Sequence, residues 1–81
     1  MEIKQYQAAM EAIFFASGEP VSVSRLSEVL DLDDETTIRI ADDLMHDYNT
    51  RSGGLHIVRL DDQYQMCTSK EYAEYVRKAM D

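Results

Sequence analysis

Residues 8–17 read AAMEAIFFAS and are apolar at eight of ten positions, near the start of an acidic chain of 81 residues. Neither proline nor glycine interrupts residues 4–17, whereas Gly18 and Pro20 follow directly. This pattern predicts a helix that ends at Ser17, with Gly18 as its left-handed cap. At 100° per residue, the apolar positions sweep roughly 260° of the helix circumference. Such a helix must be covered on more than one side.

The two apolar sides of this helix differ in the size of their side chains. The small side, with Ala9, Ala12 and Ala16, suits close approach by other helices of the same chain. The members of the bulky side are Ile3, Tyr6, Met10 and Phe14. We expect the bulky side to be an exposed apolar patch through which two copies of the chain associate. The alternative is that the rest of the same chain covers it.

The size of the chain also favours association. We expect residues 1–81 to form one domain, and a chain of this length buries only about 60% of its unfolded surface. Small domains therefore often need a disulfide, a metal or a second subunit. Cys67 is the single cysteine, and with two histidines far apart in sequence it lacks the spacing of a zinc site. Oligomerisation remains as the expected supplement.

Two further helices are predicted after the first. Ser22 is placed to cap a short helix over VSRLSEVLD, and Asp33 or Asp34 to cap a longer helix that runs to about Asn49. The expected buried stripes are Leu26, Val29 and Leu30 in the second helix, and Ile38, Ala41, Leu44, Met45 and Tyr48 in the third. The expected solvated face of the third helix carries Glu35, Arg39, Asp42, Asp43 and His46.

The last third of the sequence predicts a hairpin and a closing helix. LHIVRL and YQMCT flank Asp61-Asp62-Gln63, as in a β-hairpin. Thr68 and Glu71 have the spacing of a capping box. The closing helix would carry a stripe of Tyr72, Tyr75, Val76 and Ala79. Three helices, a β-hairpin wing and a closing helix predict an α+β winged helix-turn-helix fold, with an unrelated α+β arrangement as the alternative.

Two stretches resemble a known family. AIFFASGEPVSVSRLSEVLDLD and GGLHIVRLDDQYQMCTSKEYAEYV are similar to the amino-terminal winged-helix domain of segregation and condensation protein B, from about Tyr6 to Val76. The resemblance implies a non-enzymatic accessory subunit of the SMC-kleisin, condensin-like complex, which acts in chromosome condensation and segregation. It also implies a homodimer that helps to bind the kleisin, segregation and condensation protein A, and through it SMC.

The resemblance has two limits within this chain. Family members typically carry a second winged-helix domain, so these residues are expected to be the amino-terminal half of a longer type of protein. The small residues usual at the wing tip are replaced here by Asp61 and Asp62. No wing contact is therefore carried over from the family.

A DNA-binding winged-helix regulator is the main alternative function. Arg25, Arg39, Arg51 and Arg59 fall where phosphate or base contacts would be expected. The net charge of the chain is -8, and residues 33–51 hold six acids against two arginines, a local balance of -4. Because phosphates would be repelled, we expect no strong direct nucleic-acid binding and favour ion pairs for these arginines, such as Arg39 with Asp43.

Three tyrosines form a second candidate partner site. Tyr64, Tyr72 and Tyr75 cluster in the predicted hairpin and closing helix. They are expected either to cap the core with their hydroxyl groups in water or to line a groove for an amphipathic partner helix.

No enzyme, cofactor, metal or small-molecule site is expected. His46 and His56 lack a catalytic setting, and Gly53-Gly54 lacks the lysine of a phosphate-binding loop. Cys67 alternates with Met66 in a strand, as a packed thiol does. The polar start MEIKQYQ and the absence of a long apolar run predict neither a signal peptide nor a membrane span, and thus a cytoplasmic protein.

Overall fold

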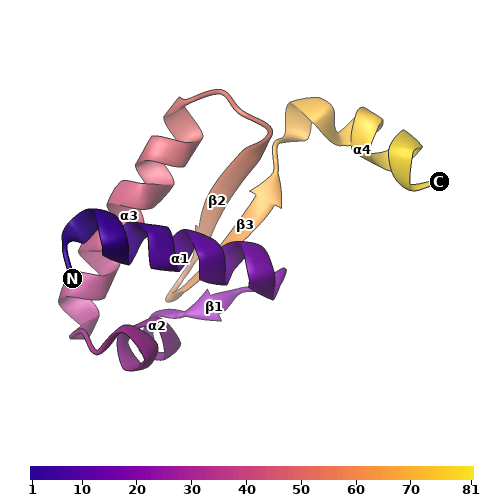
Figure 1. The fold of residues 1–81 in the computed structure, drawn as a ribbon. Coiled ribbons are helices and arrows are strands. Elements are labelled where there is room, and N and C mark those ends of the chain that lie inside the picture. Colours follow the sequence, from indigo (N-terminus) through magenta and orange to yellow (C-terminus); the bar gives the residue numbers. More distant parts are fainter.

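Helices and a three-stranded antiparallel sheet make up the computed structural model, which describes all 81 residues (Figure 1). In chain order the elements are α1 (Ile3–Ser17), β1 (Val21–Ser22), α2 (Val23–Leu30), α3 (Asp34–Thr50), β2 (Leu55–Leu60), β3 (Gln63–Thr68), the 3-10 turn η1 (Lys70–Tyr72) and α4 (Ala73–Met80). The predicted order of three helices, hairpin and closing helix is confirmed.

The helix ends follow from the predicted capping residues. Gly18 has φ 65°, and its N–H donates to the carbonyl of Phe14 over 3.4 Å. Ser22 accepts from the backbone N–H of Arg25 at 3.0 Å, and Asp33 from that of Thr36 at 3.0 Å. Hydrogen bonds from Thr36 also lower the pKa of Asp33. The first three helix boundaries are thus set locally.

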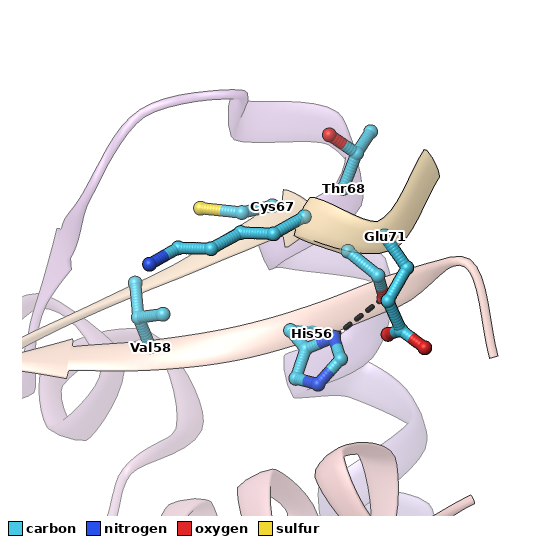
Figure 2. Close-up of a pocket in the computed structure, with 7 residues that line it drawn as sticks. His56, Val58, Cys67, Thr68 and Glu71 are labelled. Carbon is cyan, nitrogen blue, oxygen red and sulfur yellow. Dashed lines mark hydrogen bonds between the residues drawn. The ribbon is translucent and has the colours of Figure 1, made fainter. Parts of the chain in front are cut away.

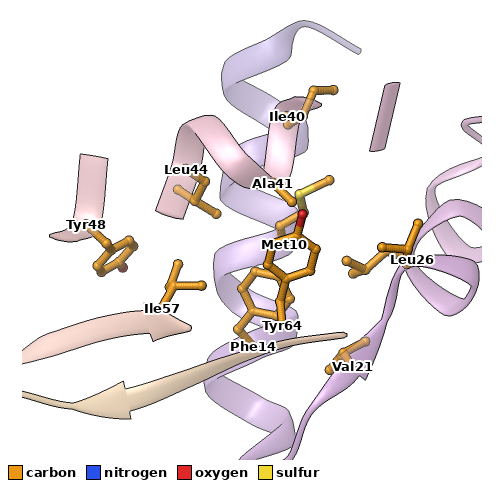
Figure 3. Packing of buried hydrophobic residues seen from close by; sticks show 11 residues of the cluster. Met10, Phe14, Val21, Leu26, Ile40, Ala41, Leu44, Tyr48, Ile57 and Tyr64 are labelled. Atoms are coloured by element: carbon orange, nitrogen blue, oxygen red, sulfur yellow. The ribbon is translucent and has the colours of Figure 1, made fainter. Parts of the chain in front are cut away.

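The core lies where the inner side of α1 meets α3 and the hairpin (Figure 3). Its members are Met10, Phe14, Val21, Val23, Leu26, Ile40, Ala41, Leu44, Tyr48, Ile57 and Tyr64. The rings of Phe14 and Tyr64 stack with centroids 6.0 Å apart. The hairpin therefore covers the first helix through β3 while it also packs on α3 through β2.

A short strand before α2 was not predicted from the sequence. Val21 pairs with Tyr64, and Ser22 pairs with Gln63, which gives the strand order β1-β3-β2. The pairing joins the turn after α1 to the wing. A two-residue strand beside Pro20 carries no alternation signal, so no sequence pattern indicates it.

Several side chains predicted to be buried in α2 and α3 lie beside the buried side of their helix and not on it. Val29 is 59% exposed, although Leu26 on the same helix is completely buried. In α3 the buried stripe includes Thr37 and Ile40, whereas Ile38 and Met45 are half-buried. The buried side of α3 includes Thr37 because the buried Ser27 hydroxyl donates to the Thr37 hydroxyl at 2.9 Å. A polar pair thus occupies part of the contact between α2 and α3.

The closing helix does not pack on the core. Thr68 ends β3, and Ser69 precedes η1 without a side-chain cap, so the predicted capping box is wrong. No residue of α4 is buried, and α4 packs closely against η1 alone. Figure 1 shows α4 leading away from the other helices, and the molecule measures 41 × 22 × 21 Å.

The two faces of α2 provide a stability test. We expect Leu26→Ala to lower the free energy of unfolding by about 2–5 kcal/mol, because it opens a cavity among completely buried side chains. Val29→Ala on the exposed face should change it by less than about 0.5 kcal/mol. Urea unfolding followed by far-UV circular dichroism checks both. Equal losses in the two variants would contradict the observed orientation of α2.

Candidate partner-binding surfaces

A polar cluster holds the hairpin on α3. The Tyr64 hydroxyl donates to Asp42 at 2.6 Å, and the Arg59 guanidinium donates to the same carboxylate at 2.9 Å. Burial and the bond to Asp42 both raise the pKa of Tyr64 far above its usual range. Asp42 was expected to be solvated, but it faces the wing and fixes the hairpin in place.

A second polar contact joins α1 to the end of α3. The Tyr48 hydroxyl donates to Glu11, and the Arg51 guanidinium lies 4.2 Å from the centre of the Tyr48 ring. Burial, followed by the bond to Glu11, raises the pKa of Tyr48. These contacts leave Tyr48 buried in the core while its hydroxyl reaches the exposed Glu11 of α1.

The four residues of the predicted dimer patch do not share one exposed surface. Ile3 is 54% exposed and Tyr6 is half-buried. Met10 and Phe14 are 0% and 1% exposed, so the prediction that they lie at the surface is wrong. The reason is that β3 covers them through Tyr64. A carboxylate placed at residue 14 would disrupt the core and would not report on a dimer.

The apolar surface that α1 does present lies on another side. Phe15 is 75% exposed and stands beside a groove of about 300 Å³ between α1, the end of α3 and the hairpin. The residues that line this α1–hairpin groove are Ala8, Glu11, Ala12, Phe15, Tyr48, Leu55 and Met66. The sequence indicates this groove only by the spacing of Ala8, Ala12 and Phe15, which follow one another at about one helical turn along α1.

A second concave surface lies on the outer side of the hairpin, where β3 leads into η1 (Figure 2). This hairpin groove has a volume of about 430 Å³ and is lined by His56, Val58, Cys67, Thr68, Ser69, Lys70 and Glu71. The buried Ser69 hydroxyl donates to the Gly53 carbonyl at 2.7 Å and lies 2.5 Å from His56 Nδ1. These bonds fix the point from which α4 departs.

The edge of the sheet beside this groove is partly closed. β2 is an edge strand, because the strand order is β1-β3-β2. The Asn49 side chain donates to the Ile57 carbonyl at 3.0 Å and accepts from the Ile57 N–H at 3.0 Å. The main-chain groups that an added strand would need in the middle of β2 are therefore already bonded.

The three tyrosines of the predicted partner groove do not share one surface. Tyr64 is completely buried in the core, so its assignment to a partner groove is wrong. Tyr72 and Tyr75 are 41% and 69% exposed on η1 and α4. With Val76 and Met80 they give the detached helix an apolar side, which we call the α4 face.

Most of the arginines on the predicted DNA side have partners within the chain. Arg25 pairs with Glu28 at 3.8 Å, Arg59 pairs with Asp42, and Arg51 stacks on a tyrosine. The expected pair between Arg39 and Asp43 is not formed. The exposed side of α3 keeps an excess of carboxylates.

Two further expectations concern ions and membranes. No group of three or more histidine, cysteine or acidic side chains is arranged to hold a metal ion. None of the helices combines the length and the apolar character that a membrane span requires.

The arrangement of α1, α2 and α3 with a hairpin wing defines a winged-helix domain, here with apolar rather than basic exposed surfaces. The family model described as "Segregation and condensation complex subunit ScpB" matches residues 8–81, and the chain belongs to this family.

Individual relatives agree with this assignment. Segregation and condensation protein B of Lachnoclostridium phytofermentans is 40% identical over 78 residues, which cover 96% of this chain and 41% of the relative. A crystal structure described as a dimer of the ScpB N-terminal domain complexed with ScpA peptide matches with a TM-score of 0.87 and 28% identity, covering 95% of this chain and 96% of the other.

A third similarity concerns the fold alone. ScpB from Mycobacterium tuberculosis matches with a TM-score of 0.92 at 16% identity, covering 99% of this chain and 50% of the other. The chain spans about two-fifths of the length of the curated relatives, 41% in both Ruminiclostridium cellulolyticum and Lachnoclostridium phytofermentans.

The buried bond between Tyr64 and Asp42 predicts a dependence on alkaline pH. The folded state raises the pKa of Tyr64 above its ordinary value of 10.0, so this stabilisation is complete below pH 10 and is lost as the pH rises beyond it. Tyr64→Phe should lower the stability at pH 7 by about 1.5–3 kcal/mol and flatten its decline above pH 10.

Urea unfolding at pH 7 to 11 checks this expectation, with Tyr75→Phe on the exposed α4 face as the matched control. The control should retain the alkaline decline of the unchanged chain. An equally steep decline in Tyr64→Phe would show that Tyr64 is not its source.

Proposed function

We propose that the chain is the amino-terminal, dimerising and kleisin-binding domain of a non-enzymatic, cytoplasmic subunit of an SMC-kleisin complex that condenses and segregates chromosomes. The similarity that carries this proposal is the one to the ScpB N-terminal domain, described as a dimer with ScpA peptide. That similarity covers nearly all of both chains, so the helices and strands of that domain have counterparts in this one.

The surface of the chain supports a role in protein binding. The chain exposes several large apolar side chains, namely Ile3, Phe15, Val29, Val58, Leu60, Tyr72, Tyr75 and Met80. Most of them border the two grooves or form the α4 face. Contiguous exposed apolar patches mark sites of association.

The hairpin groove is the site that we assign to the kleisin segment. Alternation along β2 places His56, Val58 and Leu60 on the outer side of the sheet, and Cys67 lies opposite His56 on β3. Because Asn49 occupies the backbone groups of Ile57, the partner is not expected to add a strand at the middle of this edge. An amphipathic helix with its apolar side on Val58 fits better.

DNA binding is the weaker alternative. In a winged helix the third helix usually enters the major groove, but here its exposed side is mainly acidic, and neighbouring groups already hold Arg51 and Arg59. The chain offers few free cations for the phosphates that dominate DNA affinity.

The molar mass in solution tests the main proposal. We expect the 9.3 kDa chain to sediment at about twice that mass at high micromolar concentration, and the mass to rise further with a peptide from the centre of the kleisin. Val58→Glu should weaken peptide binding at least about tenfold and keep the dimer, because the charge enters the hairpin groove. Val29→Glu on α2 is the control that should keep both.

The outcomes separate the two parts of the proposal. A monomer at high micromolar concentration contradicts the dimerising role. A dimer whose mass does not change with the peptide contradicts kleisin binding by this domain.

A titration with random-sequence duplex DNA tests the alternative. Because of the net charge of -8, we expect no complex at 50 mM salt. Fluorescence anisotropy with a labelled duplex measures it. Binding that weakens steeply with added salt would favour the DNA-binding regulator.

A further inference from the structure

The helix α4 exposes an apolar side that the rest of the chain does not cover. None of its residues is buried, and its most extensive contact is with the neighbouring η1. Tyr72, Tyr75 and Met80 are 41%, 69% and 78% exposed. Apolar side chains gathered on one exposed surface mark a site of association.

The chain does not fold α4 back onto its own body. The radius of gyration is 13.3 Å, whereas a compact chain of this length has about 12 Å. In Figure 1 the carboxyl end of α4 lies far from α1, α2 and α3. The bonds between Ser69 and residues 53 and 54 hold the start of η1 and so direct α4 outward.

We propose that the α4 face of one copy of the chain occupies the α1–hairpin groove of a second copy, and that the second copy does the same in return. This inference rests on the homodimer of the proposed function and specifies how its two chains hold each other. A two-fold dimer needs a surface that is complementary to itself, and one helix plus one groove on each chain meet that requirement.

The shape and chemistry of the groove fit such a helix. Ala8 and Ala12 lie one turn apart on α1 and allow the backbone of another helix to approach closely. Leu55 and Met66 form the opposite wall, and Phe15 extends the apolar surface at the rim. The residues of the α4 face, Tyr72, Tyr75, Val76 and Met80, supply bulky side chains for this space.

The distribution of charge favours α4 over any other part of the chain as the occupant. Residues 70–81 contain three basic and three acidic residues and have no net charge. Residues 1–69 contain five basic and thirteen acidic residues, a balance of -8. When α4 enters the groove, the segment in contact with the second body is therefore neutral and carries Arg77 and Lys78, whereas residues 1–69 would on average bring further negative charge.

The first experiment compares two variants of α4 by sedimentation equilibrium of the whole chain. Tyr75→Gln with Ala79→Gln alters the α4 face, because Ala79 lies one turn after Tyr75 on the same side of α4, and should raise the dimer dissociation constant at least about tenfold. Glu74→Gln with Lys78→Gln has the same spacing on the salt-bridged side of α4 and should change the constant less than about threefold. Because α4 buries nothing, neither variant should unfold the body.

The second experiment uses complementation between two defective chains. Ala12→Gln with Phe15→Gln fills the groove on the exposed side of α1 and should also weaken the homodimer. Mixed in equal amounts, the α4 variant and the groove variant retain one intact contact, and should form a heterodimer more tightly than either variant pairs with itself. An interface of α1 on α1 or of α4 on α4 gives no such rescue.

The results distinguish this inference from the proposed function. If the unchanged chain is a monomer, both fail. If it is a dimer but the α4 variant dimerises equally well, or the mixture shows no rescue, the exchange of α4 is overturned and the homodimer stands. An α4 variant that stays dimeric and loses only the kleisin peptide overturns the exchange in favour of the kleisin as occupant.

Discussion

The stacking of Phe14 on Tyr64 is the contact on which the arrangement of this domain depends. It brings the hairpin over α1, and the Tyr64 hydroxyl then ties the same strand to Asp42 on α3. One side chain thereby connects three elements that are distant in sequence. Since Arg59 binds the same carboxylate from the neighbouring strand, the wing is held by ionic and aromatic contacts as well as by burial. Phe14 and Met10 are consequently covered within one chain.

This internal cover decides where the remaining apolar surface lies. The wing is used to cover α1, so it is not available to cover the closing helix, and α4 leaves the domain with its tyrosines exposed. A small domain buries too little surface to cover every apolar side by itself. The unpaired apolar surface is therefore on α4, on Phe15 and in the two grooves, rather than on the side of α1 that carries Met10.

The fold could be predicted from the sequence to a large extent because its boundaries are encoded locally. Gly18, Ser22 and Asp33 each act on a backbone group within four residues, so reading the neighbouring residues is sufficient. The candidate site could not be predicted in the same way. Periodicity shows that Met10 and Phe14 are apolar, but whether β3 or a second chain covers them depends on where the hairpin lies. That position depends on Tyr64 and Asp42, two polar-tipped residues whose pairing across 22 positions leaves no local pattern.

The side chain of Asn49 shows how the domain restricts the form of its partners. An edge strand beside an apolar groove invites both strand addition and helix docking, and nothing in the groove itself selects between them. By bonding both main-chain groups of Ile57, Asn49 removes the hydrogen bonds that make an added strand favourable at the middle of β2. A helix needs none of those bonds, since its own backbone is already satisfied. The amide of Asn49 therefore favours a helical form for the kleisin segment that we assign to the hairpin groove.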